Sequence, residues 1–174
     1  FHSNGVYLIC NGEIYNHKTL QEKYNIQTKS QSDCEVVLHM YKMFGFDETC
    51  RQLDGVFSLI IYNSKSKKLF VSRDPYGVRP LFIGYNEYEE LFLSSEMKCI
   101  HDKTIYCKQF KPGHELEIDL TNGNKIFRNY YDFVYKIDRI RDYDFILAGI
   151  KNKLISAVKK RLLSDRPIGA LLSG

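Results

Sequence analysis

Pairs of short apolar runs, each pair joined by a few turn residues, dominate most of this sequence. Three such pairs follow one another along the chain: residues 56–62 with 68–72, 80–85 with 91–94, and 115–120 with 125–131. The connections contain turn formers such as Asn63, Asn86 and Gly123. Two strands joined by so short a turn pair in antiparallel fashion. The sequence therefore predicts a fold built mainly from antiparallel sheet.

Two helices are expected to lie on the faces of this sheet. Residues 5–10 form an apolar run that stops at Asn11 and Gly12, which predicts a buried strand leading into a tight turn. Asn16 can then cap a helix that extends to about Tyr24.

The second helix is expected to begin after Ser32 or Asp33, either of which can cap it. Its apolar residues recur every three or four positions until Gly45 ends the helix, and they are Val36, Val37, Met40, Tyr41 and Phe44. This spacing is typical of an amphipathic helix that lies on a sheet.

The end of the chain changes from strands to a helix. Residues 138–143 are charged and lose the strand pattern. One helical face follows and ends before Pro167, with apolar residues at Leu147, Ile150, Leu154, Val158 and Leu162. We therefore expect a first domain over residues 1–136, and a linker with the beginning of a second domain over residues 137–174.

Charge and hydropathy argue against several classes of function. The net charge of +4 comes from 25 basic and 21 acidic residues that are scattered along the chain, so no nucleic-acid partner is expected. The sequence contains no run of eighteen apolar residues, so no membrane-spanning segment is expected either.

The cysteines and histidines favour neither a disulfide scaffold nor a metal site. The five cysteines are odd in number and lack a Cys-x-x-Cys pair, which favours a reducing, cytoplasmic location. Cys10 ends an apolar run and is expected to be a core thiol. The five histidines lack the spacing of metal ligands.

The first candidate for chemistry is the pair Asn11 and Gly12. Acyl transfer from a carboxamide passes through a tetrahedral oxyanion, which an Asn side-chain amide and a free backbone N–H can stabilise. The same dipeptide is also a common hairpin turn, so the pair alone decides little.

Glu13 strengthens the functional interpretation, because a turn has no need of a carboxylate at that place. A pocket for an amino acid needs an anion to hold the α-ammonium group. Asp33 is a second candidate anion, and from the residues alone it could equally be a helix cap.

These residues belong to a longer series of motifs that resembles asparagine synthetase. The series begins with Asn-Gly-Glu-Ile-Tyr-Asn at residues 11–16 and continues through residues 32–35, 53–57, 73–81, 95–98, 112–114 and 161–174. The resemblance covers essentially the whole chain.

The resemblance implies an α+β fold, the four-layer αββα sandwich of N-terminal-nucleophile hydrolases. It implies a class II glutamine amidotransferase domain followed by the start of an α/β ATP-pyrophosphatase domain. Asn11 and Gly12 would form the oxyanion hole, and together with Glu13 and Asp33 they would bind glutamine. Residues Leu172, Ser173 and Gly174 resemble the entry to a pyrophosphate-binding loop.

As the resemblance implies, the full-length protein would be an ATP-dependent amide ligase that makes asparagine from aspartate with ammonia from glutamine. ATP with Mg²⁺ would be used in the synthetase domain, and the assembly would be a homodimer.

Phosphoribosyl-pyrophosphate amidotransferase resembles residues 73–81 as well, but it differs after Asn11-Gly12. A β-lactam synthetase is the nearer alternative, against which the intact Asn11, Glu13 and Asp33 argue.

One departure from the family concerns the nucleophile. The family's nucleophile is a cysteine at the mature N-terminus, whose own amine acts as the base. This chain begins at Phe1, so we expect the polypeptide as given not to hydrolyse glutamine. A non-catalytic, glutamine-binding or vestigial domain is the alternative.

Arg73 and Asp74 are expected to form a structural ion pair around Gly77.

Overall fold

The computed structural model describes residues 1–135, 142–164 and 166–172. Two compact units are present, Phe1–Asp132 and Phe133–Gly174, and each is described by itself. The domain boundary expected between residues 136 and 137 lies outside the described residues. In the described ranges, no helix has both the length and the apolar character needed to cross a lipid bilayer.

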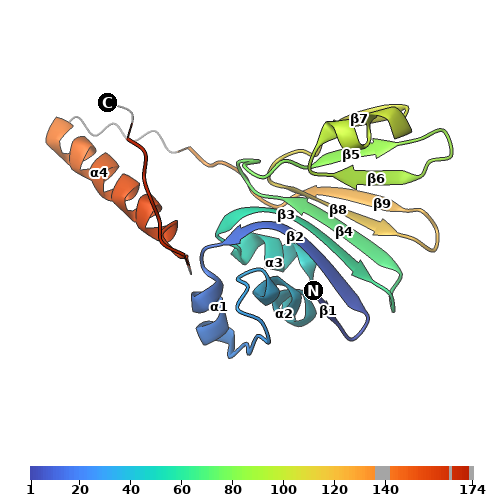
Figure 1. Cartoon of the computed structure of the whole chain (residues 1–174), viewed down its shortest axis with the longest axis horizontal. Coiled ribbons are helices and arrows are strands. Elements are labelled where there is room, and N and C mark those ends of the chain that lie inside the picture. Colours follow the sequence, from blue (N-terminus) through green and yellow to red (C-terminus); the bar gives the residue numbers. More distant parts are fainter. Residues whose placement is uncertain (136–141, 165, 173–174) are drawn as a thin grey trace. The chain divides into compact units, whose positions relative to one another are not determined.

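A six-stranded antiparallel sheet forms the centre of the first unit (Figure 1). Its order is β1-β2-β3-β4-β8-β9. The strands are β1 (His2–Ser3), β2 (Val6–Ile14), β3 (Gly55–Asn63), β4 (Lys68–Arg73), β8 (His114–Asp119) and β9 (Lys125–Asn129). The hairpins β3-β4 and β8-β9 are the first and third pairs that the sequence predicts.

A second antiparallel sheet has the order β6-β5-β7. It contains β5 (Phe82–Tyr85), β6 (Leu91–Ser94) and β7 (Tyr106–Gln109), with the short 3-10 turns η1 (Met97–Cys99) and η2 (His101–Lys103) between β6 and β7. The β5-β6 hairpin was expected, whereas β7 was not. Its sequence Tyr-Cys-Lys-Gln has no apolar alternation, and the strand forms because its backbone pairs with β5.

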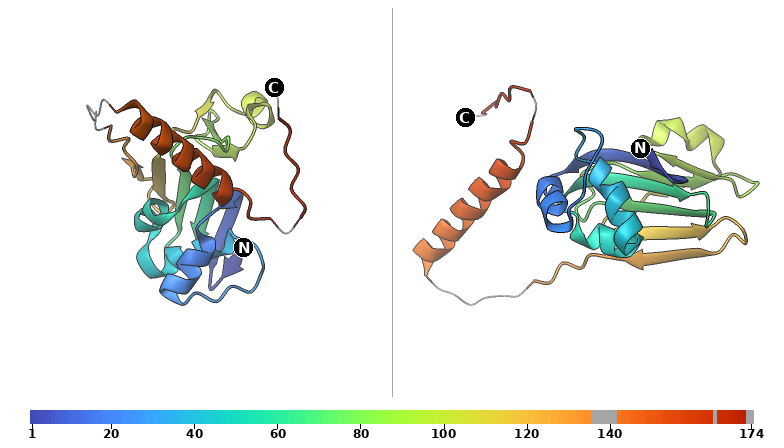
Figure 2. Two further views of the ribbon diagram at one scale, coloured as in Figure 1. Left: turned by 90° about the vertical axis from the view of Figure 1, so that its left-hand side faces the viewer. Right: turned by 90° about the horizontal axis from the view of Figure 1, so that it is seen from below.

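Three helices cover one face of the large sheet: α1 (His17–Tyr24), α2 (Glu35–Phe44) and α3 (Phe46–Gln52) (Figure 1, Figure 2). The expected apolar face of α2 is buried at Val36, Val37 and Met40. Burial of one such side chain contributes about 1.5–3 kcal/mol. The sequence did not predict α3, which begins immediately after Gly45 ends α2.

Strand β4 shows how the layers are arranged, because its neighbouring side chains point to opposite faces. Phe70 joins the core beneath the helices, whereas Val71 packs with Ile83 and Phe110 in a second core between the two sheets. A helical layer and two antiparallel sheets therefore lie one upon another. This α+β arrangement supplies one helical layer and both sheet layers of the αββα sandwich that the resemblance implies.

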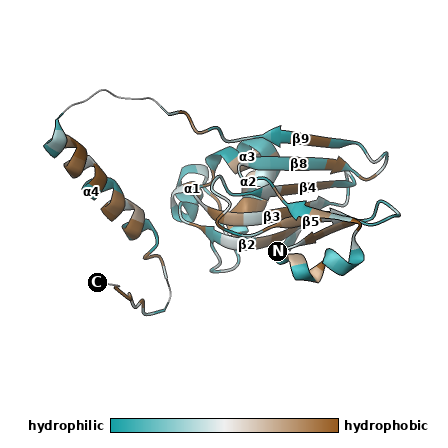
Figure 3. Ribbon diagram, turned by 90° about the horizontal axis from the view of Figure 1, so that it is seen from above, coloured by the Kyte–Doolittle hydropathy of each residue, from teal (hydrophilic) through white to brown (hydrophobic). Residues whose placement is uncertain are grey.

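The second unit contains α4 (Tyr143–Lys160). Its N-cap is Asp142, whose Oδ1 accepts hydrogen bonds from the backbone N–H groups of Asp144 and Phe145 at 3.1 and 3.2 Å. Figure 3 shows apolar residues along this helix, and those of the predicted face are exposed within this unit. Leu162, which we assigned to the helix, lies beyond its end.

Candidate functional site: an open strand edge beside a loop

Asn11 and Gly12 lie within strand β2, so the expected tight turn at this position is wrong. Both residues continue the ladder with β3, where Asn11 faces Ser58 and Gly12 faces Phe57. A Cβ atom on Gly12 would lie 2.1 Å from the carbonyl oxygen of Val56 and 2.6 Å from the Cα of Phe57. Glycine is therefore required because β3 approaches closely, and not because the chain turns.

Along the edge of β2 that faces away from β3, backbone N–H groups bond to parts of the chain other than β3. The N–H of Leu8 donates to the carbonyl oxygen of Phe1 at 2.8 Å, and the N–H of Ile14 donates to the Oδ2 atom of Asp33 at 2.6 Å. Along an antiparallel strand, the N–H groups of successive residues point alternately toward the neighbouring strand and away from it. Gly12 is an even number of residues from both Leu8 and Ile14, so its N–H points to this same edge. Gly12 thus presents a backbone donor outside the ladder with β3.

The side chains of β2 also alternate between its two faces. Leu8 and Ile14 are buried beneath the helices, whereas Asn11 and Glu13 are exposed. Residues two apart in a strand share one face. The Asn11 amide and the Glu13 carboxylate therefore lie on one face of β2, beside the backbone donor of Gly12.

Asp33 is not the cap of α2, although capping was one of its two predicted roles. The N-cap of α2 is Cys34, and it makes no side-chain capping bond. The Asp33 carboxylate instead accepts the N–H of Ile14 at 2.6 Å, which joins the segment before α2 to the open edge of β2. The structure thus brings Asp33 next to the strand that carries Asn11, Gly12 and Glu13.

Glu35 holds the loop that carries Asp33. Its carboxylate accepts hydrogen bonds from the N–H of Lys29 at 2.9 Å, and from the N–H and the hydroxyl of Ser30 at 2.7 and 2.5 Å. Burial favours the neutral acid, but these donors outweigh it and lower the pKa of Glu35 from 4.5 to about 2. Glu35 is consequently ionised at neutral pH and fixes this loop.

Arg79 is a neighbour of the candidate site that we did not predict. Its Nη2 atom lies 3.2 Å from the Oε1 atom of Glu13, 66 positions away along the chain. Both side chains are partly exposed, so this ion pair contributes little to stability and mainly orients Glu13. The motif Arg-Asp-Pro-Tyr-Gly-Val-Arg at residues 73–79 was the available signal, but its contact with Glu13 depends on the folded sheet.

The loop that carries Arg79 is organised by Asp74, which is fully buried. Its carboxylate accepts four backbone N–H groups at 3.0–3.2 Å, those of Phe57, Tyr76, Val78 and Arg79.

Arg73 holds the same loop from the other side by donating to the carbonyl oxygens of Gly77, Arg79 and Phe110. The expected structural role of Arg73 and Asp74 is confirmed. The expected ion pair between them is wrong for the described residues, because each side chain satisfies backbone groups of the loop.

Cys10 lies within β2 and not at the end of the strand, and it is partly buried against the core beneath the helices, which agrees with the expected core thiol. Its Sγ atom lies 2.6 Å from that of Cys34. The hydrogen bond to Cys34 and, next, burial raise the pKa of Cys10 well above its usual range, so the thiol stays protonated at neutral pH. This environment does not activate the thiol as a nucleophile at neutral pH.

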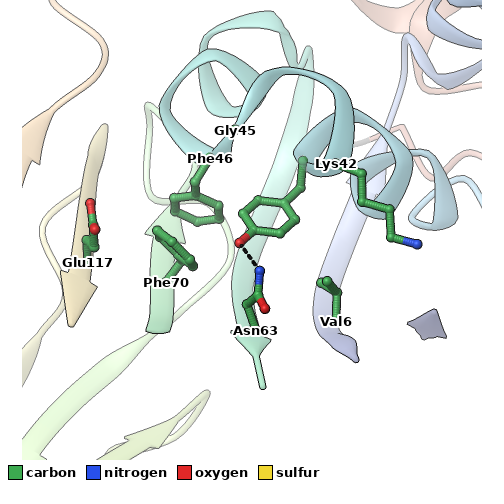
Figure 4. A pocket seen from close by; sticks show the side chains of 8 residues that line it. Val6, Lys42, Gly45, Phe46, Asn63, Phe70 and Glu117 are labelled. Atoms are coloured by element: carbon green, nitrogen blue, oxygen red, sulfur yellow. Dashed lines mark hydrogen bonds between the residues drawn. The ribbon is translucent and has the colours of Figure 1, made fainter. Parts of the chain in front are cut away.

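A separate pocket of about 560 Å³ lies where α2 and α3 meet the large sheet (Figure 4). In it, the Asn63 amide donates to the Tyr41 hydroxyl at 3.0 Å. The lining residues are Val6, Tyr41, Lys42, Gly45, Phe46, Asn63, Phe70 and Glu117, so no predicted site residue lines this pocket.

The remaining predicted site residues are at the end of the chain. Leu172 is exposed in the second unit, whereas Ser173 and Gly174 lie outside the described residues. Residues 166–172 contain neither a helix nor a strand. Within the described ranges, no group of three or more His, Cys, Asp or Glu side chains is placed to hold a metal ion.

The sequence profile of the glutamine amidotransferase domain matches residues 2–134, which include the strand edge, the loop of Asp33 and the loop of Arg79. The chain belongs to the glutamine amidotransferase domain family. The fold agrees: it is similar to glutamine phosphoribosylpyrophosphate amidotransferase from B. subtilis, with a TM-score of 0.64 and 23% identity over 77% of this chain and 31% of that one. It is also similar to an allosteric regulatory enzyme of purine biosynthesis, with a TM-score of 0.65 and 22% identity over 74% of this chain and 29% of that one.

Relatives with greater sequence similarity carry a more specific name. A probable glutamine-hydrolysing asparagine synthetase of Acanthamoeba polyphaga mimivirus is 40% identical over 99% of this chain, and the glutamine-hydrolysing asparagine synthetase of Cricetulus griseus is 36% identical over 97% of it. The human enzyme of the same name is 35% identical. In each case the amidotransferase chain spans 34% of the relative's length.

Proposed function

We propose that this chain is the glutamine-binding part of a glutamine-dependent asparagine synthetase. The single observation that carries the proposal is the backbone donor of Gly12 on the open edge of β2, with the Asn11 amide beside it. In the proposed reaction these two donors stabilise the oxyanion that forms at the carboxamide carbon of glutamine. Because both belong to a paired strand, they are held in place before the substrate arrives.

The carboxylates would bind the amino-acid end of glutamine. The Oδ2 atom of Asp33 is used by the N–H of Ile14, which leaves Oδ1 for the α-ammonium group. Glu13 would contribute the second anion, and its pairing with Arg79 keeps its side chain on the same face as Asn11. Binding would therefore place the scissile amide near the donors and the α-ammonium group near two negative charges.

We assign the nucleophile of the full-length protein to a cysteine at its mature N-terminus, as in the family that the motifs resemble. None of the five cysteines in this sequence carries a free α-amine, because each lies inside the chain. The residues described here would therefore bind glutamine and stabilise the oxyanion, and the attack itself would come from that N-terminal residue.

The whole protein would couple this ammonia to asparagine synthesis. We propose an amidotransferase domain over residues 1–136 and the beginning of the synthetase domain over residues 137–174, where aspartate and ATP with Mg²⁺ would be used. Support comes from the names of the relatives and from the resemblance of Leu172, Ser173 and Gly174 to a pyrophosphate-binding loop. A cytoplasmic location and a homodimer complete the proposal.

The test is glutamate release by the full-length gene product, with and without ATP and aspartate. We expect glutamate to be released, and we expect Asn11→Ala to lower turnover by about 10²-fold or more, the loss typical of one oxyanion donor. Asn152→Ala, an exposed change in α4, is the matched control and should leave turnover unchanged.

Circular dichroism of each variant would show that the fold is retained. If the folded full-length protein releases no glutamate, the domain is vestigial and the glutamine-dependent activity is wrong. If glutamate is released but Asn11→Ala has no effect, the assignment of the oxyanion hole fails.

A further inference from the structure

Two cysteine thiols face each other beside the candidate site. Cys10 lies in β2, Cys34 lies at the N-cap of α2, and their Sγ atoms are 2.6 Å apart. A disulfide bond needs a separation of about 2.05 Å, so the sulfur atoms have to move together by only about 0.5 Å. The other three cysteines, Cys50, Cys99 and Cys107, take no part in this contact.

The backbone around both thiols is already held in place. On one side, Cys10 is paired with Leu59 in the β2-β3 ladder. On the other side, the segment of Cys34 is attached to β2 by the bond from the N–H of Ile14 to Asp33. Cys34 also contacts the carbonyl oxygen of Gly12, with an S–O distance of 3.6 Å. Two reacting groups that are held close together react as if each were present at a very high concentration.

We propose that Cys10 and Cys34 form a reversible disulfide when the protein meets a low-molecular-weight disulfide oxidant such as oxidised glutathione. One cysteine thiolate attacks a sulfur of the oxidant, which releases one molecule of thiol and leaves a mixed disulfide. The second cysteine then attacks the protein sulfur of that mixed disulfide and releases a second molecule of thiol. Two electrons and two protons pass to the oxidant, and a reducing thiol pool reverses the exchange.

The position of the pair suggests what the bond would do. It would tie the strand that carries Asn11 directly to the segment that carries Asp33, and it would close a loop between residues 10 and 34. Closing such a loop restricts the unfolded chain and so stabilises the folded state. That the bond would also fix the glutamine pocket rests on the function proposed above.

Exposure and acidity set the expected rate. Cys10 is partly exposed and can meet a small oxidant, whereas Cys34 is buried. Because the hydrogen bond to Cys34 and burial raise the pKa of Cys10, little thiolate is present, and we expect oxidation over minutes to hours. In a reducing compartment the pair remains a dithiol, in agreement with the setting that the cysteine pattern favours.

The experiment treats the reduced protein with excess oxidised glutathione, alkylates the remaining thiols and maps the tryptic peptides by mass spectrometry. We expect a covalent link between the peptide that contains Cys10 and the peptide that contains Cys34. The link should disappear on reduction, and it should be absent from Cys10→Ser and from Cys34→Ser. Cys99→Ser is the matched control, because Cys99 is exposed, and this variant should form the link like the natural chain.

Thermal unfolding gives a second measurement on the same samples. Oxidation should raise the midpoint temperature of unfolding by about 5–10 °C in the natural chain and in Cys99→Ser. It should leave the midpoint of Cys10→Ser and of Cys34→Ser unchanged. Separate alkylation of Cys10 and Cys34, a glutathione adduct without the link, or a link to another cysteine would each overturn the proposal. The measurement needs no glutamine turnover, so its failure is distinct from failure of the proposed function.

Discussion

Replacing Glu35 by Gln tests the account of the loop that carries Asp33. The carboxylate accepts three hydrogen bonds from Lys29 and Ser30, and its pKa lies at about 2 instead of 4.5. Lowering the pKa of this buried carboxyl from 4.5 to about 2 corresponds to about 3 kcal/mol of stability, since each tenfold change in acidity is worth about 1.36 kcal/mol. A Gln side chain can still accept on its single oxygen, so we expect Glu35→Gln to lose about 2–3 kcal/mol at pH 7.

The dependence on pH follows from the sign of this shift. A carboxyl group whose pKa is lower in the folded state stabilises the fold above its unfolded pKa, and this stability is lost as the pH falls through the folded value. For Glu35 the contribution is complete above about pH 5, and more than about half of it is gone at pH 3.

The assay is urea unfolding of the natural chain and of Glu35→Gln at several values between pH 7 and pH 3. The free-energy difference between the two should shrink steadily as the pH falls. Glu22→Gln is the matched control, since Glu22 is exposed on α1 and loses the same charge. Equal stability of Glu35→Gln and the natural chain at pH 7, or a difference that does not change with pH, would refute the reasoning.

Two further predictions concern backbone contacts around the site. Gly12→Ala should destabilise the fold by at least about 2 kcal/mol in urea unfolding, because the new Cβ would meet backbone atoms of Val56 and Phe57 at 2.1 and 2.6 Å. Gly149→Ala is its control: this helical glycine has open space around it, and alanine there should be neutral or stabilise α4 by up to about 1 kcal/mol. Asp74→Asn should cost at least about 2 kcal/mol in the same assay, because an amide cannot accept all four N–H groups that the carboxylate accepts. The exposed change Asp102→Asn should have little effect on the free energy of unfolding. If both Asp variants lose the same stability, the buried hydrogen bonds of Asp74 do not contribute as argued here.

The regular elements were largely predictable from local pattern. The β3-β4 and β8-β9 hairpins formed where apolar runs flank turn residues, and α2 ended at Gly45 as expected. Alternation and turn chemistry act over a few residues, so a short stretch of sequence contains the information. The strand β7 and the helix α3 lack such a pattern, and they form because partners far along the chain offer backbone groups or a core to pack against.

The candidate site shows the limit of local pattern more clearly. The residue types at Asn11, Gly12 and Glu13 indicated donors and an anion, but the predicted turn was wrong because the pairing of β2 with β3 continues through these residues. Of the two roles that the sequence left open for Asp33, the helix cap is wrong, because its carboxylate accepts the N–H of Ile14 at the edge of β2.

Residue chemistry and local periodicity were therefore enough to predict an antiparallel α+β domain, whereas residues 11–13 and Asp33 were assigned to a site only through the resemblance of the longer series of motifs. Tertiary structure was needed to show that the Gly12 N–H faces an open edge, that Arg79 pairs with Glu13, and that Cys10 meets Cys34. Each of these contacts joins residues that are distant in sequence or depends on the register of two strands. Such contacts arise only when whole elements pack together, so the spacing of residues along the chain does not encode them.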